Sequence, residues 1–265
     1  MCIEKVEISG LWQRYDLVWN LNPDVNVLAG INGSGKSTIL NCISAHLIDK
    51  KESTLGHEEI NNVDIVLKNS GEMPSDDNYK INVNLIKTFD TELKSQEILQ
   101  KINKQAKTEL DLKLWKLQKE YTKYQVRIYK YNSEINRNTH IRFVSMMNEL
   151  FSETQKKVNP DKEELEFLSD NKEITPFQLS SGEKQLLIIL LTVLVQDNKP
   201  FVLLIDEPEI SLHFEWQENL INYIRELNPN VQLIIATHSA DLIMKGWGDR
   251  VFEVRDLIVK DCTMC

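Results

Sequence analysis

Apolar and polar positions follow two different periods along this 265-residue chain. Near the start, residues 3–8 alternate apolar and charged side chains, which is the period of a half-buried strand. Similar patterns predict strands at residues 15–19, 63–67 and 81–89. Residues 25–29 instead form an unbroken apolar run, typical of a strand that is buried on both faces.

The C-terminal half alternates buried strands with amphipathic helices. Two strands, at residues 164–168 and 174–177, are expected to form a hairpin around Asp170 and Asn171. The other expected elements are strands at 201–205, 231–236 and 251–254, and helices at 37–47, 182–194, 216–227 and 240–245. Strands joined by helices indicate a mostly parallel sheet, and the early antiparallel strands would form a second, smaller sheet. The predicted fold class is α/β, with mixed parallel and antiparallel sheets.

The middle of the chain, from about residue 92, has a helical pattern. Apolar and aromatic side chains recur there at alternating spacings of three and four, which is a heptad seam. The seam consists of Leu114, Leu117, Tyr121, Tyr124, Ile128, Tyr131 and Ile135. It could be half of a short antiparallel coiled coil, or one face of an amphipathic helix packed on the rest of the chain. A break is expected at residues 136–139 and a further helix at 143–151.

Charge is distributed unevenly around the net value of -9. Between Lys80 and Lys157 there are 16 basic and 9 acidic residues, whereas the rest of the chain has 15 basic and 31 acidic residues. The basic segment is either the solvated face of a lysine-rich helix or a contact surface for nucleic acid or an acidic partner.

Length and composition limit the class of protein. The chain can form one large core with an inserted lobe, and four cysteines are too few for a disulfide scaffold. It has no apolar run of about 18 residues and does not begin like a signal peptide. We therefore expect a soluble cytoplasmic protein that does not act in the membrane.

A glycine-rich loop separates the buried strand at 25–29 from the following helix. It reads Gly30-Ile31-Asn32-Gly33-Ser34-Gly35-Lys36-Ser37 and fits the phosphate-binding loop, or Walker A, pattern. Glycines let backbone N–H groups approach phosphates closely, and the helix N-terminus adds its dipole. Lys36 is expected to reach the β and γ phosphates of ATP, and the Ser37 hydroxyl is a natural ligand for Mg²⁺.

Two carboxylates, Asp206 and Glu207, end the apolar strand at 201–205. Asp206 could hold Mg²⁺, directly or through water. Glu207 could point the opposite way and polarise an attacking water molecule. The pair could also be only a structural turn, but the phosphate loop upstream favours the catalytic interpretation.

A third motif, Leu179-Ser180-Ser181-Gly182-Glu183-Lys184-Gln185, begins an apolar helix. Alone it is a good helix N-cap. Together with the other two motifs it resembles the signature of ABC-type ATPases. The resemblance implies an ABC-type P-loop ATPase head that hydrolyses ATP as a head-to-head homodimer. Ser181 and Gly182 of one copy would then contact the nucleotide held by the other.

The resemblance also implies roles for further residues. His238, in Ala236-Thr237-His238-Ser239, matches the switch histidine that contacts the γ-phosphate in this family. The implied nucleotide contacts are Gly30, Asn32, Gly33, Ser34, Gly35, Lys36, Ser37, Thr38, Ser181 and Gly182. The family normally places a glutamine after the strand at 81–89, and this chain has Asp90 there. Asp90 is the preferred third ligand for Mg²⁺, and Gln96 is the alternative.

Two details suggest which branch of the family is closest. Asn32 resembles the chromosome-maintenance and recombination ATPases, and the segment Glu209-Ile210-Ser211-Leu212-His213 resembles RecF-like and OLD-like ATPases, including heads of prokaryotic anti-phage systems. These features differ from transporter subunits. The resemblance assigns residues 1–90 and 160–265 to the head and 91–159 to a helical insertion.

The leading hypothesis is an ATPase subunit of an anti-phage complex that controls a partner effector, a nuclease or toxin from another chain. The alternatives are a DNA-repair ATPase that clamps DNA with its basic insertion, and an ATP-locked scaffold that hydrolyses slowly. Cys262 and Cys265 have metal-ligand spacing but form only half a site. Cys2 and Cys42 are expected to be buried, and Trp12, Arg14 and Tyr15 to pack in the core or stack on adenine.

Overall fold

The computed structural model describes residues 1–48, 60–68, 81–88, 106–131, 134–160 and 162–261. These residues fall into two compact units. The first unit comprises Met1–Lys87, Pro200–Glu209 and Asn230–Cys265, and the second comprises Thr88–Lys199 and Ile210–Pro229. No helix in the described part of the chain is both long and apolar enough to cross a membrane.

A five-stranded parallel sheet forms the centre of the first unit, in the order β11-β3-β10-β9-β5. Its strands are β3 (Val25–Ala29), β5 (Val83–Lys87), β9 (Phe201–Asp206), β10 (Val231–Thr237) and β11 (Val251–Glu253). Every residue of β9 and β10 is buried. This explains why both strands consist mainly of apolar residues with no alternation. Because neighbouring strands are parallel, their carboxyl ends meet at one edge of the sheet.

A second sheet of the first unit is antiparallel, in the order β12-β2-β1-β4. Its strands are β1 (Cys2–Leu11), β2 (Tyr15–Asn20), β4 (Asn62–Lys68) and β12 (Ile258–Asp261). Ile3, Val6 and Ile8 of β1 are buried, in keeping with the alternation in the sequence. This confirms the smaller antiparallel sheet that the early strands predict.

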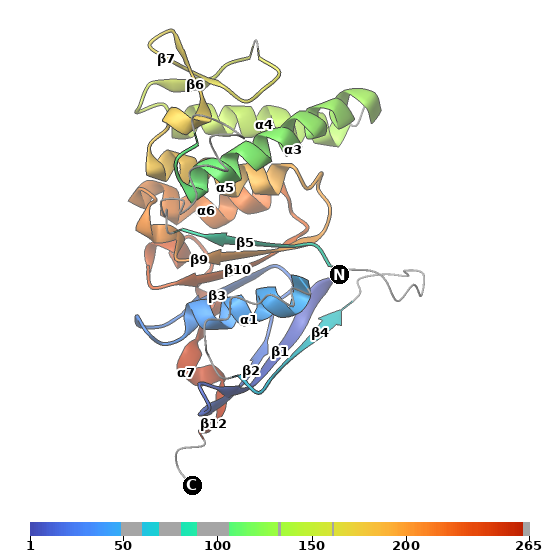
Figure 1. The fold of residues 1–265 in the computed structure, drawn as a ribbon, viewed down its shortest axis with the longest axis vertical. Coiled ribbons are helices and arrows are strands. Elements are labelled where there is room, and N and C mark those ends of the chain that lie inside the picture. Colours follow the sequence, from blue (N-terminus) through green and yellow to red (C-terminus); the bar gives the residue numbers. More distant parts are fainter. Residues whose placement is uncertain (49–59, 69–80, 89–105, 132–133, 161, 262–265) are drawn as a thin grey trace. The chain divides into compact units, whose positions relative to one another are not determined.

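One helix, α1 (Lys36–Ile48), lies between the two sheets of the first unit (Figure 1). Its buried Ile39, Leu40 and Ile43 pack into a single apolar core with side chains from both sheets. Ile3 of β1 and Ile234 of β10 belong to the same core. The helix that carries the phosphate-loop lysine at its start is therefore held on both sides by apolar packing.

The second unit is mainly helical. Its helices are α3 (Glu109–Tyr131), α4 (Glu134–Leu150), α5 (Ser181–Leu194) and α6 (Phe214–Leu227), and a small antiparallel sheet consists of β6 (Lys156–Val158), β7 (Phe167–Ser169) and β8 (Lys172–Ile174). α3 packs against α5, and its Tyr121 and Tyr124 contact α4. Of the two interpretations of the heptad seam, the packed amphipathic helix is the one observed. The last seam positions, Tyr131 and Ile135, are exposed.

Three expectations about single elements were wrong. Residues 136–139 lie inside α4 and are not a break, because the tyrosines of α3 hold this turn of α4 through contacts at Asn136 and His140. The helix expected at 240–245 is only a 3₁₀ turn, Asp241–Ile243, and Val254 starts a short helix, α7 (Val254–Leu257), instead of ending a strand.

The expected hairpin is confirmed, since Asp170 and Asn171 both have positive φ angles between β7 and β8.

The mixed α/β class is confirmed. The expected boundary between a head and an insertion at 91–159 stays a prediction. In the structure, α3 and α4 belong to the same compact unit as α5 and α6.

Candidate functional site

The glycine-rich loop lies between the end of β3 and the start of α1. Gly33 and Gly35 have φ angles of +80° and +94°, which glycine adopts without the penalty that a Cβ carries. A Cβ on Gly35 would also overlap the ring of Trp12, which lies against the loop. Glycine at position 35 is therefore favoured by the backbone conformation, and any Cβ there would also require the Trp12 ring to move.

Lys36 is almost fully buried at the first position of α1, with a side chain 3% exposed. Its Nζ donates to the carbonyl oxygens of Gly30, at 2.9 Å, and Ile31, at 3.3 Å. The side chain is thus folded back over the loop that its own helix begins. Nearby, the buried Ser34 hydroxyl has no hydrogen-bond partner among the described residues, so a phosphate oxygen could satisfy it.

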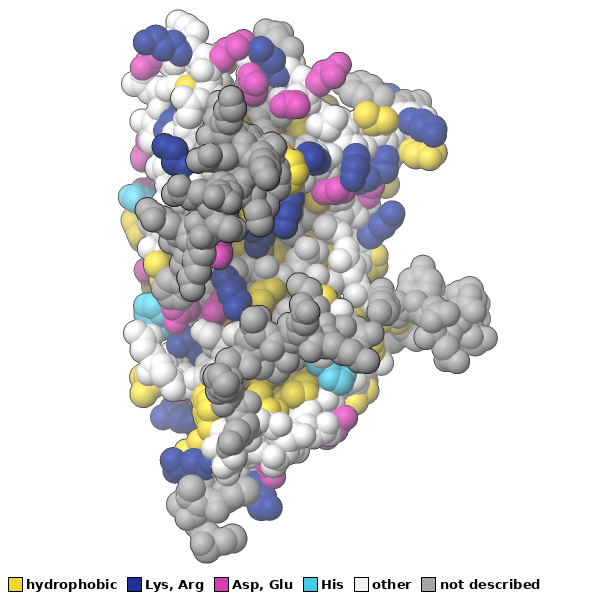
Figure 2. All heavy atoms as spheres, in the orientation of Figure 1, with side chains coloured by type: hydrophobic (Ala, Val, Ile, Leu, Met, Phe, Trp, Pro, Cys, Tyr) yellow, Lys and Arg dark blue, Asp and Glu magenta, His cyan; other side chains and the backbone are white. Residues whose placement is uncertain are grey.

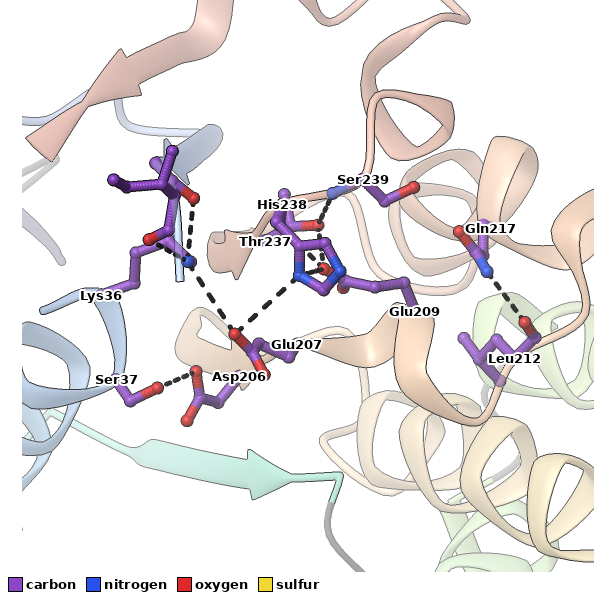
Figure 3. Close-up of polar contacts among 12 residues, drawn as sticks. Lys36, Ser37, Asp206, Glu207, Glu209, Leu212, Gln217, Thr237, His238 and Ser239 are labelled. Atoms are coloured by element: carbon purple, nitrogen blue, oxygen red, sulfur yellow. Dashed lines mark hydrogen bonds and ion pairs between the residues drawn. The ribbon is translucent and has the colours of Figure 1, made fainter. Parts of the chain in front are cut away.

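Ser37 and Asp206 face each other across the site. The Ser37 Oγ donates to Asp206 Oδ1 at 2.9 Å (Figure 3). Burial raises the pKa of Asp206. The neighbouring Glu207 charge adds to this, while the Ser37 hydrogen bond and the charges of Lys87 and Lys36 oppose it. A divalent cation would offset the cost of keeping this carboxylate charged.

A hydroxyl and a carboxylate oxygen are the ligands that Mg²⁺ prefers, so Ser37 and Asp206 fit a magnesium site. No cluster of three or more His, Cys, Asp or Glu with metal-binding geometry occurs among the described residues. The two oxygen ligands would leave room for water and phosphate oxygens, as is usual for Mg²⁺ bound with a nucleotide.

Glu207 turns away from the strand that carries Asp206. Its φ angle is +49°, a left-handed conformation that costs about 1–2 kcal/mol for a residue with a Cβ. Its backbone N–H donates to the Ala236 carbonyl at 2.8 Å, which holds this conformation. Glu207 Oε1 lies 3.8 Å from Lys36 Nζ and 3.9 Å from His238 Nδ1. Backbone strain of this kind is characteristic of functional sites.

His238 follows β10, beside the end of β9 (Figure 3). Its ring is 45% exposed, and its Nδ1 lies 2.9 Å from Oε1 of Glu209. The same carboxylate oxygen accepts from the Thr237 hydroxyl and from the His238 backbone N–H. The sequence motifs assign no role in the site to Glu209, which appears only in the segment that resembles RecF-like and OLD-like ATPases. Glu209 could have been found as an acidic residue just beyond the end of β9, because β9 lies next to β10, the strand that ends in Thr237.

The structure therefore brings Lys36, Ser37, Asp206, Glu207 and His238 together at one edge of the parallel sheet. Of the other nucleotide contacts implied by the resemblance, Asn32 is exposed in the loop and Thr38 is half-buried on α1. This arrangement can bind a phosphate chain, hold a divalent cation and place a carboxylate and an imidazole beside them.

The signature segment belongs to the second unit. Ser180 caps α5: its Oγ accepts from the Glu183 N–H, and its own N–H donates to Glu183 Oε2 at 2.9 Å. Ser181 is exposed at the start of the helix. A Cβ on Gly182 would overlap the carbonyl oxygen of Ser211, so a glycine is needed there for packing alone.

Glu183 is buried and paired. Its Oε1 lies 2.7 Å from Lys156 Nζ and accepts a 2.7 Å hydrogen bond from the Thr154 hydroxyl. Burial works to raise the pKa of Glu183, but the hydrogen bonds from Lys156, Ser180 and Thr154 together outweigh it and leave the pKa lowered. The carboxylate that shapes the signature turn is thus held charged mainly by Lys156 at the start of β6 and by Thr154 just before it.

Several predicted positions lie outside the described residues: Asp90, Gln96, Cys262 and Cys265. Cys42 is buried in the core, and Cys2 is only partly buried. Tyr15 contacts Trp12 edge to face and lies under the Arg14 guanidinium.

Comparisons with known proteins give the family and the fold of this chain. Residues 68–245 match the protein family described as "AAA domain, putative AbiEii toxin, Type IV TA system". The "Retron Vc95 probable ATPase" of Vibrio cholerae serotype O1 biovar El Tor is 27% identical over 34% of this chain and 20% of its own length. The "Retron Ec83 probable ATPase" of Escherichia coli is 35% identical over 26% of this chain and 15% of its own length.

A third relative is the "Putative hemin import ATP-binding protein HrtA" of Staphylococcus aureus (strain Newman), 32% identical over 36% of this chain and 41% of its own length. The chain spans less than half the length of each of these three relatives. Among solved structures, an SMC head bound to the C-terminal winged-helix domain of ScpA superposes with a TM-score of 0.57 and 19% identity, over 92% of this chain and 91% of that one. The SMC head domain of Thermotoga maritima superposes with a TM-score of 0.52 and 16% identity, over 96% and 94%. Both show that this chain has the fold of an SMC-type ATPase head.

Proposed function

The chain belongs to the AAA-domain family whose description names AbiEii, and on that premise we propose that it binds ATP with Mg²⁺ and hydrolyses it to ADP and phosphate. The observation that carries this proposal is the 2.9 Å contact between Ser37 and Asp206, with Lys36 and Glu207 beside it. An accidental phosphate-loop match would not bring a carboxylate from a strand 169 residues away onto the loop's own serine.

Each residue has a distinct role in this proposal. Lys36 leaves the Gly30 and Ile31 carbonyls to contact the β and γ phosphates, and the Ser34 hydroxyl gains a phosphate oxygen as its partner. Ser37 and Asp206 would hold Mg²⁺, which would neutralise charge on the phosphate oxygens. Glu207 orients and polarises the attacking water. His238 contacts the γ-phosphate.

We propose further that two copies meet head to head through ATP. The exposed start of α5, with Ser181 and Gly182, supplies a helix N-terminus that suits an anion. In the dimer, these residues of one copy would contact the γ-phosphate held by the first unit of the other. Two observations support this dimer: the signature motif occurs together with the phosphate loop and the paired carboxylates, and the chain has the fold of an SMC head.

The dimer would control an effector protein, a nuclease or toxin from another chain, in an anti-phage defence complex. Two relatives are named as retron ATPases, and the family description names a toxin of a toxin–antitoxin system. Because this chain covers only part of those relatives, the partner is inferred from this context and from no contact in the structure.

The Glu207→Gln variant tests both the proposed hydrolysis and the proposed dimer, through its ATPase rate and its oligomeric state with and without ATP. Gln keeps the size of Glu207 but cannot act as a general base, so hydrolysis should fall by a factor of about 10²–10⁴ while ATP still binds. We expect light scattering to detect a dimer with ATP and Mg²⁺, and a monomer when Lys36→Ala is added. Glu215→Gln, a change at an acidic residue in the first turn of α6, serves as the matched control and should behave like the parent.

Two results would count against this proposal in different ways. A Glu207→Gln protein that binds ATP but stays monomeric would remove the sandwich dimer and leave the nucleotide site standing. A parent protein with Mg²⁺-dependent affinity for ATP but no hydrolysis would instead favour the slowly hydrolysing scaffold.

A DNA-binding ATPase is the second candidate. Figure 2 shows Lys and Arg side chains gathered over α3 and α4, with acidic side chains among them. Lys116, Lys119 and Lys123 of α3 are exposed. If this surface binds duplex DNA, replacing the three lysines by glutamine should weaken binding. The slope of log K against log[salt] should also become shallower, by the equivalent of up to about three phosphate contacts. An unchanged salt dependence would identify the helix face as merely solvated.

A further inference from the structure

We infer that Glu209 is a positioning residue that sets the orientation and the tautomer of His238. This inference rests on the proposed role of His238 at the γ-phosphate. Glu209 lies in the 3₁₀ turn Pro208–Ile210 that follows Glu207, and its side chain is only 6% exposed. Nothing in the phosphate-loop chemistry described above uses this carboxylate.

A single oxygen of Glu209 holds the segment that carries the histidine. Oε1 accepts from the Thr237 hydroxyl at 2.7 Å and from the His238 backbone N–H at 2.8 Å. The Ser239 backbone N–H donates in turn to the Thr237 hydroxyl at 2.9 Å. These contacts attach three consecutive residues, Thr237 to Ser239, to the turn after β9 (Figure 3).

The third contact of Glu209 Oε1 is with the imidazole ring, at 2.9 Å from His238 Nδ1. A carboxylate can only accept a hydrogen bond, so Nδ1 must carry a proton in this contact. Nε2 of a neutral ring is then unprotonated and can only accept a hydrogen bond. A carboxylate on one nitrogen determines which nitrogen is protonated and how the ring is oriented.

The position of Glu209 follows from the sheet. β9 and β10 are parallel neighbours, with Ala236 paired to Asp206, so the segments after both strands leave the same edge side by side. Glu207 takes the first part of the turn and points toward Lys36, at 3.8 Å. Glu209, two residues later, reaches Thr237 and His238. Glu207 thus lies toward the phosphate-loop lysine, and Glu209 contacts the histidine segment.

Nitrogen NMR of the ring measures this arrangement without any activity assay. The protein labelled with ¹⁵N-histidine is compared with its Glu209→Leu variant at a pH well above the ordinary histidine pKa of about 6.5. In the parent, the His238 signals should be those of the Nδ1–H tautomer. In Glu209→Leu they should shift toward the mixture of tautomers found for a free ring. The five histidines of the chain are distinguished by assigning His238 with a His238→Ala variant.

Two further variants separate a role at the ring from support of the loop. Glu209→Gln keeps an acceptor oxygen and should retain the Nδ1–H tautomer. If the leucine variant fails to fold, the glutamine variant still tests the inference. Thr237→Val removes the hydroxyl contact but leaves the Glu209 contact to the ring, and its His238 signals should match the parent. A parent spectrum with the proton on Nε2, or identical signals in the parent and Glu209→Leu, would overturn the inference.

Steady-state kinetics then test the consequence for hydrolysis. Glu209→Leu should lower kcat by about 10–100-fold, as loss of an orienting partner commonly does, with KM for ATP changed less than about twofold. In a His238→Ala background the same change should cause no additional loss, because the two residues act as a unit. Equal losses in both backgrounds would show that Glu209 does not act through His238. If the parent lacks ATPase activity, the proposed function fails, and the NMR result still decides the role of Glu209.

Discussion

The Ser37 hydroxyl donates to the Asp206 carboxylate at 2.9 Å, joining the first turn of α1 to the end of β9. One residue comes from the phosphate loop, and the other from the carboxyl end of an interior strand of the parallel sheet. Asp206 is 6% exposed, and burial raises its pKa. The pair is therefore a buried oxygen site that a cation would stabilise.

Ser37→Ala should weaken nucleotide binding only when Mg²⁺ is present. The change removes one metal ligand but leaves Lys36 and the loop backbone, so we expect about a tenfold loss of ATP affinity with Mg²⁺, worth about 1.4 kcal/mol. Little change is expected with EDTA. Titration of a fluorescent ATP analogue under both conditions measures this difference. Equal losses with and without Mg²⁺ would contradict a metal role for Ser37.

Gly35→Ala should destabilise the first unit more than a change in φ alone can explain. The added Cβ costs about 1–2 kcal/mol for the positive φ angle and overlaps the Trp12 ring. The Trp12 ring, which is 36% exposed, must also shift to make room for the added Cβ. Urea unfolding gives the loss of stability, and ATP binding should also be weakened.

Gly246→Ala is the matched control, because Gly246 has a φ angle of +98° and open space around its Cβ position. It should show only the conformational cost. Adding Trp12→Ala to Gly35→Ala should recover part of the lost stability. No recovery in this double variant would show that Trp12 does not restrict the loop.

Lys156→Met should destabilise the second unit by about 2–4 kcal/mol at neutral pH. The change leaves the Glu183 carboxylate buried without its cation, which is costly even though Thr154 and Ser180 still donate to it. Chemical denaturation measures the loss. Lys123→Met removes the exposed pair with Glu120 on α3 and should change stability little.

Acid should remove part of this stabilisation in the parent protein. The pKa of Glu183 is lowered in the folded state, so its contribution is present above the ordinary value of 4.5 and is lost as pH falls through the folded value. Without Lys156, the raising effect of burial is less opposed, so the folded pKa of Glu183 should lie closer to the ordinary value and the acid-dependent loss of stability should be smaller. Unfolding curves at a series of pH values between about 3 and 7 test this, and parallel curves for parent and variant would contradict it.

Much of the candidate site at the carboxyl edge of the parallel sheet could be predicted from local patterns. The glycine loop, the apolar strand ending in Asp206 and Glu207, and the segment with His238 each combine a strand end with polar residues. Parallel strands bring their carboxyl ends together, so three separate motifs predict one site. The hairpin at Asp170 and Asn171 was also predictable, because two residues with positive φ are needed and these types tolerate it.

The sequence pattern was misleading where packing outweighs local preference. Three of the four residues 136–139, Asn-Arg-Asn-Thr, are weak helix formers, and the stretch indicated a break. The Tyr124 hydroxyl donates to the Asn136 carbonyl, and Tyr121 contacts His140, so the helix continues. A helix was expected at 240–245 from a short pattern, and only one 3₁₀ turn forms there.

By itself, then, the sequence determined the elements with strong periodicity and the residue types proposed to contact phosphate and metal, because short stretches of chain are enough to identify both. Only the tertiary structure decided which carboxylate faces which partner. The positive φ of Glu207 directs it toward Lys36, and the adjacency of β9 and β10 places Glu209 on His238. Such pairings depend on strand order and backbone direction at a turn, which residues distant in sequence settle together.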